Sequence, residues 1–224
     1  RLALEFAYHA VDSLLRGRVR LVLVGGVSGS GKSTLARPLA RALGADLLRS
    51  DVVRRDLGPV RDALAGPGDA AGAADGSTAP PAEGAVGRGR YSTGAVDAVY
   101  EELLRRAADL LGRGRSVVLD ATWLEPLRRA EAETVAADAF AELVEISCTA
   151  PRDMLARRIV ERARRGDDPS EATVEVLDAQ LASSAPWPEA IEVDTAELDV
   201  RDETRVGAWA ERTLGPLPWA HRSP

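Results

Sequence analysis

A glycine-rich stretch near the start of the chain has the spacing of a phosphate-binding loop. Residues 25–34 read GGVSGSGKST, in which four residues separate Gly26 from Gly31 and Lys32-Ser33 follows directly. Glycines let backbone amides turn inward and approach phosphate oxygens without a side-chain clash. We therefore expect a nucleotide to be held here, the alternative being a glycine-rich turn that binds nothing.

The residue types in this loop predict which groups bind the phosphates and which bind the metal. The Lys32 ammonium would reach the β- and γ-phosphates, and the Ser33 hydroxyl would complete the coordination shell of Mg²⁺. Thr34 would lie beside the α-phosphate. The predicted nucleotide site also includes the loop residues whose backbone would surround the phosphates. These are Gly26, Ser28, Gly29, Ser30 and Gly31.

Two carboxylates follow apolar segments that read as strands. Asp120 ends SVVLD, where it would lie near the metal at the carboxyl edge of a sheet or, alternatively, cap the next helix. Asp51 ends ADLLRSD and is predicted to accept a proton from an attacking hydroxyl. Arg54, one helical turn on, would orient a substrate or steady the transferring charge. Asp51 also suits the N-cap of a helix that opens with SDVVR, and the spacing leaves both roles open.

A group of arginines lies on a predicted helix over residues 151–166. Arg158, Arg162 and Arg165 are spaced i, i+4 and i+7, so they share one face of this helix. An arginine face over the phosphates would expel water and stabilise the charge in transfer. Arginines near a helix C-terminus often just face solvent, because the helix dipole favours them there.

Composition narrows the classes of protein. The 224 residues include one cysteine and two histidines, which excludes an internal disulfide and fits a reducing, cytoplasmic setting. The net charge of −6 argues against long nucleic acids as partners. No apolar run reaches the ~20 residues of a membrane helix. Cys148 is expected in the core, and Trp123 either in the core or on the floor of a substrate pocket.

An alternation of strands and helices must bring these residues together. Apolar runs predict strands, and the segments between them have helical periodicity. The predicted strands cover residues 18–26, 45–51, 116–122, 141–148 and 190–195, and the predicted helices cover residues 2–16, 32–44, 93–114, 125–139, 151–166, 169–182 and 205–214. This order indicates an α/β fold in which a doubly wound parallel sheet has helices on both faces.

The composition changes between residues 59 and 89, where Gly, Ala, Pro and Asp dominate. No periodicity survives there, and such a segment buries too little apolar surface to offset the entropy of ordering it. We expect a flexible insertion that is, over most of its length, a surface loop without a role.

Five segments together resemble the P-loop kinases of the AAA-like kinase family, which are related to polynucleotide kinase, gluconate kinase and the zeta-toxin kinases. They are GGVSGSGKSTLA, LLRSDVVRRDL, YSTGAVDAVYEELL, VVLDATWLEPLRR and APRDMLARRIVERARRGDDPSEA. The resemblance implies a nucleoside-monophosphate-kinase-like sheet of five parallel strands in the order 2-3-1-4-5. It also implies ATP and Mg²⁺ as cofactors.

The resemblance extends to single positions. It implies that Asp51 is the catalytic aspartate and Arg54 a substrate-side arginine. It implies that Arg158 and Arg162 are lid arginines, and that Asp120 serves either the metal or the substrate.

The resemblance also bears on the division of the chain. Residues 1–18 look like the connector that follows an aminoglycoside-phosphotransferase-like domain in fused relatives. Residues 19–224 would then form the kinase domain, with the insertion at 59–89, and a preceding domain of that kind is an expected partner.

Three functions fit these patterns. The leading hypothesis is a kinase that moves the γ-phosphoryl group of ATP to a hydroxyl of a small molecule. An ATP-binding regulatory module would need Lys32 and Ser33 but neither Asp51 nor the lid arginines. A 5′-hydroxyl nucleic-acid kinase would admit only a short strand end, because the chain lacks basic and aromatic tracts.

Overall fold

Five parallel strands form one sheet in the order β2-β3-β1-β4-β5, which confirms the predicted fold class and strand order. The computed structural model describes residues 2–64, 93–165 and 173–218. The strands are β1 (Arg20–Gly25), β2 (Asp46–Arg49), β3 (Val117–Asp120), β4 (Glu142–Thr149) and β5 (Ile191–Asp194). All of β1 is buried, which explains why its sequence is almost continuously apolar.

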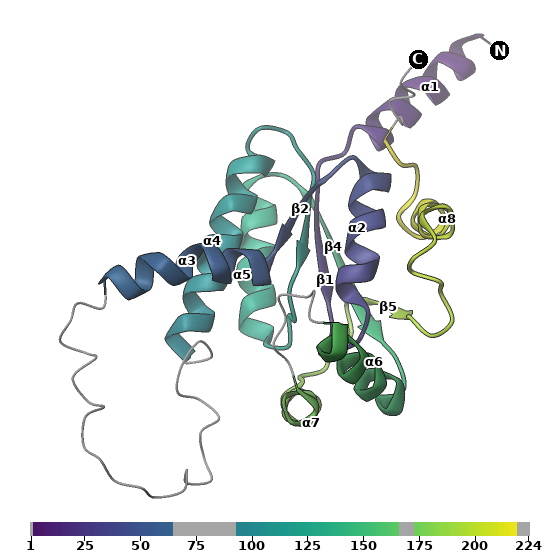
Figure 1. The fold of residues 1–224 in the computed structure, drawn as a ribbon. Helices are drawn as coiled ribbons and strands as arrows, with labels where there is room; N and C mark the ends of the chain where they lie inside the picture. The colour runs from purple at the N-terminus through teal and green to yellow at the C-terminus, as the bar shows by residue number, and fades with distance from the viewer. Residues whose placement is uncertain (1, 65–92, 166–172, 219–224) are drawn as a thin grey trace, which may run out of the picture.

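Helices cover both faces of this sheet (Figure 1). The described helices are α1 (Leu2–Arg16), α2 (Lys32–Leu43), α3 (Ser50–Leu64), α4 (Thr93–Leu111), α5 (Pro126–Asp138), α6 (Arg152–Arg165), α7 (Val174–Ser183) and α8 (Glu203–Leu214). Of these, α1 extends away from the sheet, and α6 and α7 lie beyond the strand ends (Figure 1). Leu21 and Leu23 of β1 pack in a core with α4 and α5, whereas Val22 and Val24 pack in a second core with α2 and α8. None of the described helices is long and apolar enough to cross a membrane.

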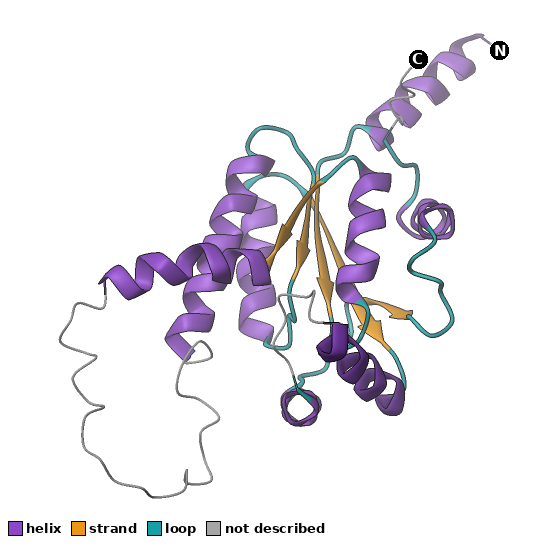
Figure 2. Ribbon diagram, in the orientation of Figure 1, coloured by secondary structure: helices purple, strands orange, loops and turns teal. Residues whose placement is uncertain are grey.

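The carboxyl ends of the five strands lie at one edge of the sheet (Figure 2), and α6 and α7 lie beyond that edge (Figure 1). In parallel sheets of this kind, ligands bind at the carboxyl edge, outside the strand ends. The fold therefore gathers the loop after β1, the end of β3 and the start of α3 at one edge of the sheet.

The helix boundaries refine three expectations. α2 continues through the buried Pro38 and ends at Gly44, which takes the left-handed conformation expected of a C-cap. β2 ends at Arg49, so Asp51 lies in the first turn of α3 rather than at the end of a strand. Residues 59–64 of the predicted insertion continue α3, and residues 65–89 lie outside the described part of the chain.

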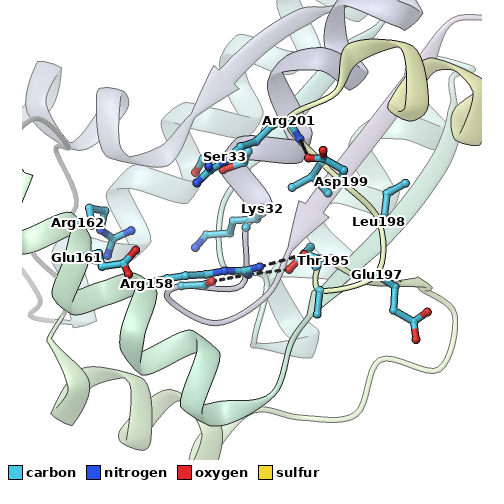
Figure 3. Close-up of a pocket in the computed structure, with 15 residues that line it drawn as sticks. Lys32, Ser33, Arg158, Glu161, Arg162, Thr195, Glu197, Leu198, Asp199 and Arg201 are labelled. Carbon is cyan, nitrogen blue, oxygen red and sulfur yellow. Dashed lines mark hydrogen bonds between the residues drawn. The ribbon is translucent and has the colours of Figure 1, made fainter.

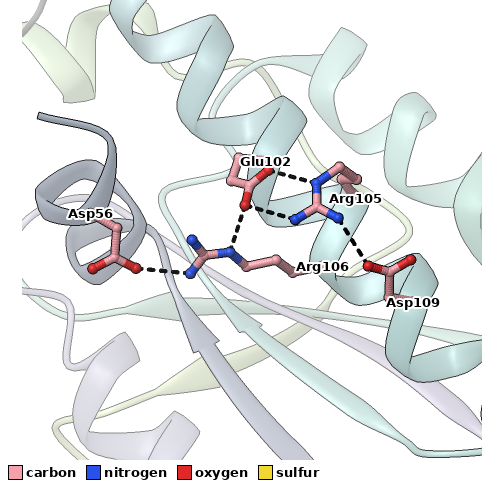
Figure 4. A network of polar contacts seen from close by, with 5 residues as sticks. All are labelled: Asp56, Glu102, Arg105, Arg106 and Asp109. Atoms are coloured by element: carbon pink, nitrogen blue, oxygen red, sulfur yellow. Dashed lines mark hydrogen bonds and ion pairs between the residues drawn. The ribbon is translucent and has the colours of Figure 1, made fainter. Parts of the chain in front are cut away.

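A cluster of charges ties α3 to α4 and thereby fixes the helix that carries Asp51. Glu102 accepts hydrogen bonds from Arg105 and Arg106, and Arg106 also donates to Asp56 of α3 at 2.9 Å (Figure 4). The two guanidiniums lower the pKa of Glu102 from 4.5 to about 2. Ionised Glu102 is therefore stabilised in the folded chain.

The Glu102 cluster predicts a pH-dependent contribution to stability. Because the folded pKa lies below the ordinary value, the contribution is complete above about pH 4.5 and disappears as the pH falls toward 2. Glu102→Gln is expected to lower the free energy of unfolding at pH 7 by less than about 1 kcal/mol, since solvent screens the pair. Urea unfolding at pH 7 and at pH 3 should show the gap to wild type narrowing at the lower pH. A gap that is equal at both values would contradict this prediction.

Candidate active site

The loop between β1 and α2 needs glycine where the sequence has it. Gly26 has a φ of 132°, and a Cβ there would lie 2.5 Å from the carbonyl oxygen of Cys148. Gly29 has a φ of 81°, and its Cβ would lie 2.6 Å from the carbonyl oxygen of Leu155. Both contacts are too short for any side chain. The loop is therefore held against β4 and α6 in a conformation that only glycine adopts without strain.

The first turn of α2 has the groups that bind anions. Gly31 precedes the helix with a left-handed backbone and provides no side-chain cap for its N–H groups. Such uncapped N–H groups at a helix N-terminus, together with the helix dipole, attract phosphate. Lys32 begins the helix, and its Nζ lies 3.5 Å from the carbonyl oxygen of Val27. Ser30 is fully buried, its backbone N–H donates to the Val27 carbonyl oxygen at 3.2 Å, and its own carbonyl oxygen lies 2.8 Å from Thr195 Oγ1, so this residue holds the shape of the loop.

The loop is also held from the side of α7, by a residue that the sequence patterns did not single out. The backbone N–H of Ser28 donates to Oε1 of Gln180 at 2.7 Å. Val27 packs in a small core with Leu177 of α7 and with Leu155 of α6. The loop, α6 and α7 therefore pack as one unit.

The two predicted carboxylates lie at the same edge of the sheet and are linked by Arg49. Val24 of β1 pairs with Asp120 of β3, which pairs in turn with Arg49 of β2. Arg49 Nε donates to Asp120 Oδ2 at 3.1 Å, and its Nη2 lies 3.8 Å from Asp51 Oδ2. Arg54 donates to Asp51 Oδ1 at 3.1 Å. Asp51, the predicted base, and Asp120, the predicted metal-side carboxylate, therefore belong to one row of alternating negative and positive side chains.

Asp120 has one oxygen engaged and one without a protein partner. It is 3% exposed, and its Oδ1 has no hydrogen-bond partner within the described residues. A buried carboxylate oxygen in that state normally faces water or a cation. A free carboxylate oxygen fits the hard, oxygen-preferring Mg²⁺, so Asp120 and the Ser33 hydroxyl are the groups that would hold the metal here.

Arg158 of α6 turns back onto the phosphate-binding loop. Its Nη1 donates to the carbonyl oxygen of Gly29 at 3.2 Å and to Thr195 Oγ1 at 2.8 Å, and its Nη2 donates to the Thr195 carbonyl oxygen at 3.0 Å. Burial lowers the pKa of Arg158 from its ordinary value, and the nearby Arg201 cation lowers it further. An anion that enters here would relieve this repulsion between two cations.

A cavity of about 470 Å³ opens beside these residues. It is lined by Gly29 and residues 31–34 of the loop and α2, by Arg158, Glu161 and Arg162 of α6, and by residues 195–201. Figure 3 shows the Lys32 side chain between Arg158 and Ser33. Arg157 is 69% exposed and is absent from the lining, and the side chain of Arg165 lies outside the described part of the chain. Asp51, Arg54 and Asp120 do not line this cavity.

The segment after β5 is a wall of this cavity that the sequence patterns missed. Thr195 is 5% exposed, and its hydroxyl lies 2.8 Å from the Ser30 carbonyl oxygen and 3.1 Å from the Thr149 carbonyl oxygen. The same hydroxyl accepts from Arg158. Thr195 thus joins the loop, the end of β4 and α6 at one point.

Removing that hydroxyl is predicted to loosen the nucleotide site. Thr195→Val keeps the shape of the side chain, but it leaves Arg158 and one buried carbonyl with a bond fewer. We expect stability to fall by about 1–2 kcal/mol and the affinity for an ATP analogue to fall about tenfold. Thermal unfolding and calorimetric titration measure the two effects, and Thr195→Ser should retain most of both. Undiminished affinity in Thr195→Val would remove this role.

Cys148 and Trp123 both lie in the core. Cys148 is 2% exposed, and burial raises the pKa of its thiol to about 12, so it stays protonated at neutral pH. Trp123 is fully buried, and its ring meets that of Tyr100 edge-on at 5.1 Å. The prediction of a core cysteine is confirmed, and of the two positions expected for Trp123 the structure shows the core.

The chain matches a protein family and has curated relatives of similar sequence. Residues 21–187 match the sequence model of a family described as an AAA domain. The chain is 43% identical over 187 residues to uncharacterised proteins of Mycobacterium bovis and Mycobacterium tuberculosis. The match covers 84% of this chain and 34% of each of those proteins, so the chain spans about a third of the length of the curated relatives it matches.

Solved structures share the fold at low sequence identity. A sugar kinase from Janibacter is 19% identical with a TM-score of 0.56 over 92% of this chain and 99% of its own. The adenosine 5′-phosphosulfate (APS) kinase of Mycobacterium tuberculosis, solved with AMPPNP and APS, is 23% identical with a TM-score of 0.54 over 87% and 98%. A gluconokinase from Sinorhizobium meliloti is 18% identical with a TM-score of 0.51 over 88% and 96%.

Proposed function

This chain belongs to the AAA-domain family, and from its site we propose that it is an ATP-dependent kinase whose acceptor is a hydroxyl of a small molecule. The observation that carries the proposal is the row formed by Val24, Asp120 and Arg49. In this row Val24, just before the loop, is the register partner of Asp120, and Arg49 in turn lies 3.8 Å from the second carboxylate, Asp51. Neighbouring folds solved as a sugar kinase, a gluconokinase and an APS kinase support the same reaction class.

The donor half of the proposed site holds ATP. The loop amides and the first turn of α2 bind the phosphates, and Lys32 stabilises the negative charge that shifts toward the β–γ bridging oxygen. Arg158 and Arg162 line the cavity from α6, and guanidiniums in that position would pair with phosphate oxygens of the bound nucleotide. Ser33 and Asp120 would hold Mg²⁺, which would further neutralise the phosphate charge.

The acceptor half is built around Asp51. The acceptor oxygen forms a bond to the γ-phosphorus, the bond from that phosphorus to the β–γ bridging oxygen breaks, and ADP leaves with the bonding electrons. Asp51 takes the proton of the acceptor hydroxyl. Arg54, held 3.1 Å from Asp51, orients the carboxylate toward the acceptor.

Transfer of labelled phosphate tests this function. The chain is incubated with [γ-³²P]ATP, Mg²⁺ and separate pools of sugars, sugar acids, nucleosides and 5′-hydroxyl oligonucleotides. We expect label in one of the small-molecule pools. ATP binding without label in any pool favours a regulatory module, and label confined to the oligonucleotides favours a nucleic-acid kinase. A phosphotransferase-like domain before residue 1 and a cytoplasmic location stay predictions.

A further inference from the structure

Arg49 is the residue at this edge whose chemistry the loop motif does not explain. It belongs to β2, yet its side chain is 13% exposed and contacts two acidic groups from different elements. Asp120, on β3, is 3% exposed, and Asp51, in the first turn of α3, is 23% exposed. Burying a charged side chain to that depth costs desolvation free energy, which is offset only when its partners are held in a favourable geometry.

The direction of Arg49 follows from the pleat of the sheet. Leu47 of β2 packs in the core beneath α2, and Arg49, two residues on, points to the same face. Val118 belongs to that core as well, so Asp120 on β3 also points toward α2. Arg49 and Asp120 are register partners, which brings their side chains side by side on the face of the sheet that α2 covers.

The bond that Arg49 makes leaves one defined oxygen of Asp120 available. Nε of Arg49 holds Oδ2 at 3.1 Å, while Oδ1 is buried without a partner among the described residues. On its other side the guanidinium lies 3.8 Å from Asp51 Oδ2. Arg49 therefore separates two carboxylates that would otherwise repel each other across this edge.

From this geometry we infer that Arg49 is a positioning residue, which sets the orientation of Asp120 toward the metal and its distance from the base Asp51. The inference rests on the proposed kinase function for the role of Asp51. Its part at Asp120 does not depend on any acceptor. An arginine suits the task because its planar fork can face two carboxylates at once, whereas a lysine offers a single point charge.

Two measurements on three variants test the inference. The affinity for the fluorescent probe mant-ATP is measured in EDTA and in Mg²⁺, and the rate of phosphoryl transfer is measured with the acceptor that the labelling screen identifies. The variants are Arg49→Met, Arg49→Lys and the control Arg115→Met. Arg115 pairs with Asp46 at 2.6 Å, at the opposite end of β2, so its loss breaks an ion pair of the same strand away from the site.

We expect Arg49→Met to bind mant-ATP in EDTA within about threefold of wild type but to lose about tenfold of the affinity gained from Mg²⁺. Its transfer rate should fall about 100-fold, because displaced catalytic groups lose that much rate for small errors in position. Arg49→Lys should recover the Mg²⁺ gain yet transfer about tenfold more slowly than wild type. Arg115→Met should match wild type in both measurements.

Each other outcome overturns the inference. A wild-type rate and Mg²⁺ gain in Arg49→Met removes the role of Arg49. If Arg115→Met loses as much transfer rate and Mg²⁺ gain as Arg49→Met, the effect comes from the stability of β2. If Arg49→Lys loses as much as Arg49→Met, the positive charge of Arg49 does not position the carboxylates. If wild type binds mant-ATP but phosphorylates no acceptor, the kinase proposal fails. The affinity that Arg49→Met and wild type gain from Mg²⁺ then still tests whether Arg49 positions Asp120.

Discussion

Replacing Lys32 with methionine is expected to lower phosphoryl transfer about 1,000-fold, the size typical for loss of a cation or donor that stabilises charge in transfer. Methionine keeps the length and flexibility of the side chain and removes only the ammonium. Lys32 lies at the first position of α2 and borders the cavity beside Arg158. Lys32 is the only lysine in the sequence, and the other cations that line the cavity are arginines on other elements.

The Lys32→Met variant is measured as ADP formation with the acceptor identified by labelling, together with the affinity for mant-ATP. Affinity should fall less than the rate, since the loop amides still bind the phosphates. Arg37→Met is the matched control, because Arg37 is an exposed cation on the same helix. A variant at Lys32 that keeps more than about a tenth of the wild-type rate would be incompatible with the proposed donor site.

The donor half of the site was predictable from sequence because it is local. The glycines, Lys32 and Ser33 lie within one short segment, and the strand before it and the helix after it have clear patterns. The steric reason for Gly26 is only partly local, since a Cβ there would meet Ser30 Oγ of the same loop and, at 2.5 Å, the backbone oxygen of Cys148 on β4. The pattern gave the correct residue type without its physical cause.

Residues whose partners lie far along the chain escaped prediction. Thr195 follows a short strand of mixed polarity, and the groups it joins are 46 and 165 residues away. Arg49 was assigned to a strand, but its role depends on the register of β2 against β3, and no local pattern fixes that register. Helical spacing alone left Arg158, Arg162 and Arg165 equivalent, and the placement of α6 brings the first two to the cavity.

Asp51→Asn is expected to reduce phosphoryl transfer by about 100- to 10,000-fold while the affinity for mant-ATP changes by less than about threefold. Asparagine keeps the size of the side chain but does not take the proton of an attacking hydroxyl. Asp51 contacts Arg54 and Arg49 rather than the nucleotide cavity, so donor binding has no reason to change. Rate and affinity are measured on the same preparations, with thermal unfolding as a check of the fold.

The same variant separates catalysis from helix capping, the two roles that the sequence left open for Asp51. Asparagine caps helices about as well as aspartate, so a residue that only caps α3 would tolerate the change at full activity. Asp56→Asn is the matched control, because Asp56 lies on the same helix and pairs with Arg106 away from the strand ends. If Asp51→Asn lowers the rate and Asp56→Asn does not, the loss belongs to the carboxylate at the acceptor side. Equal small effects in both would leave Asp51 as a structural residue of α3, and the base would have to be sought elsewhere.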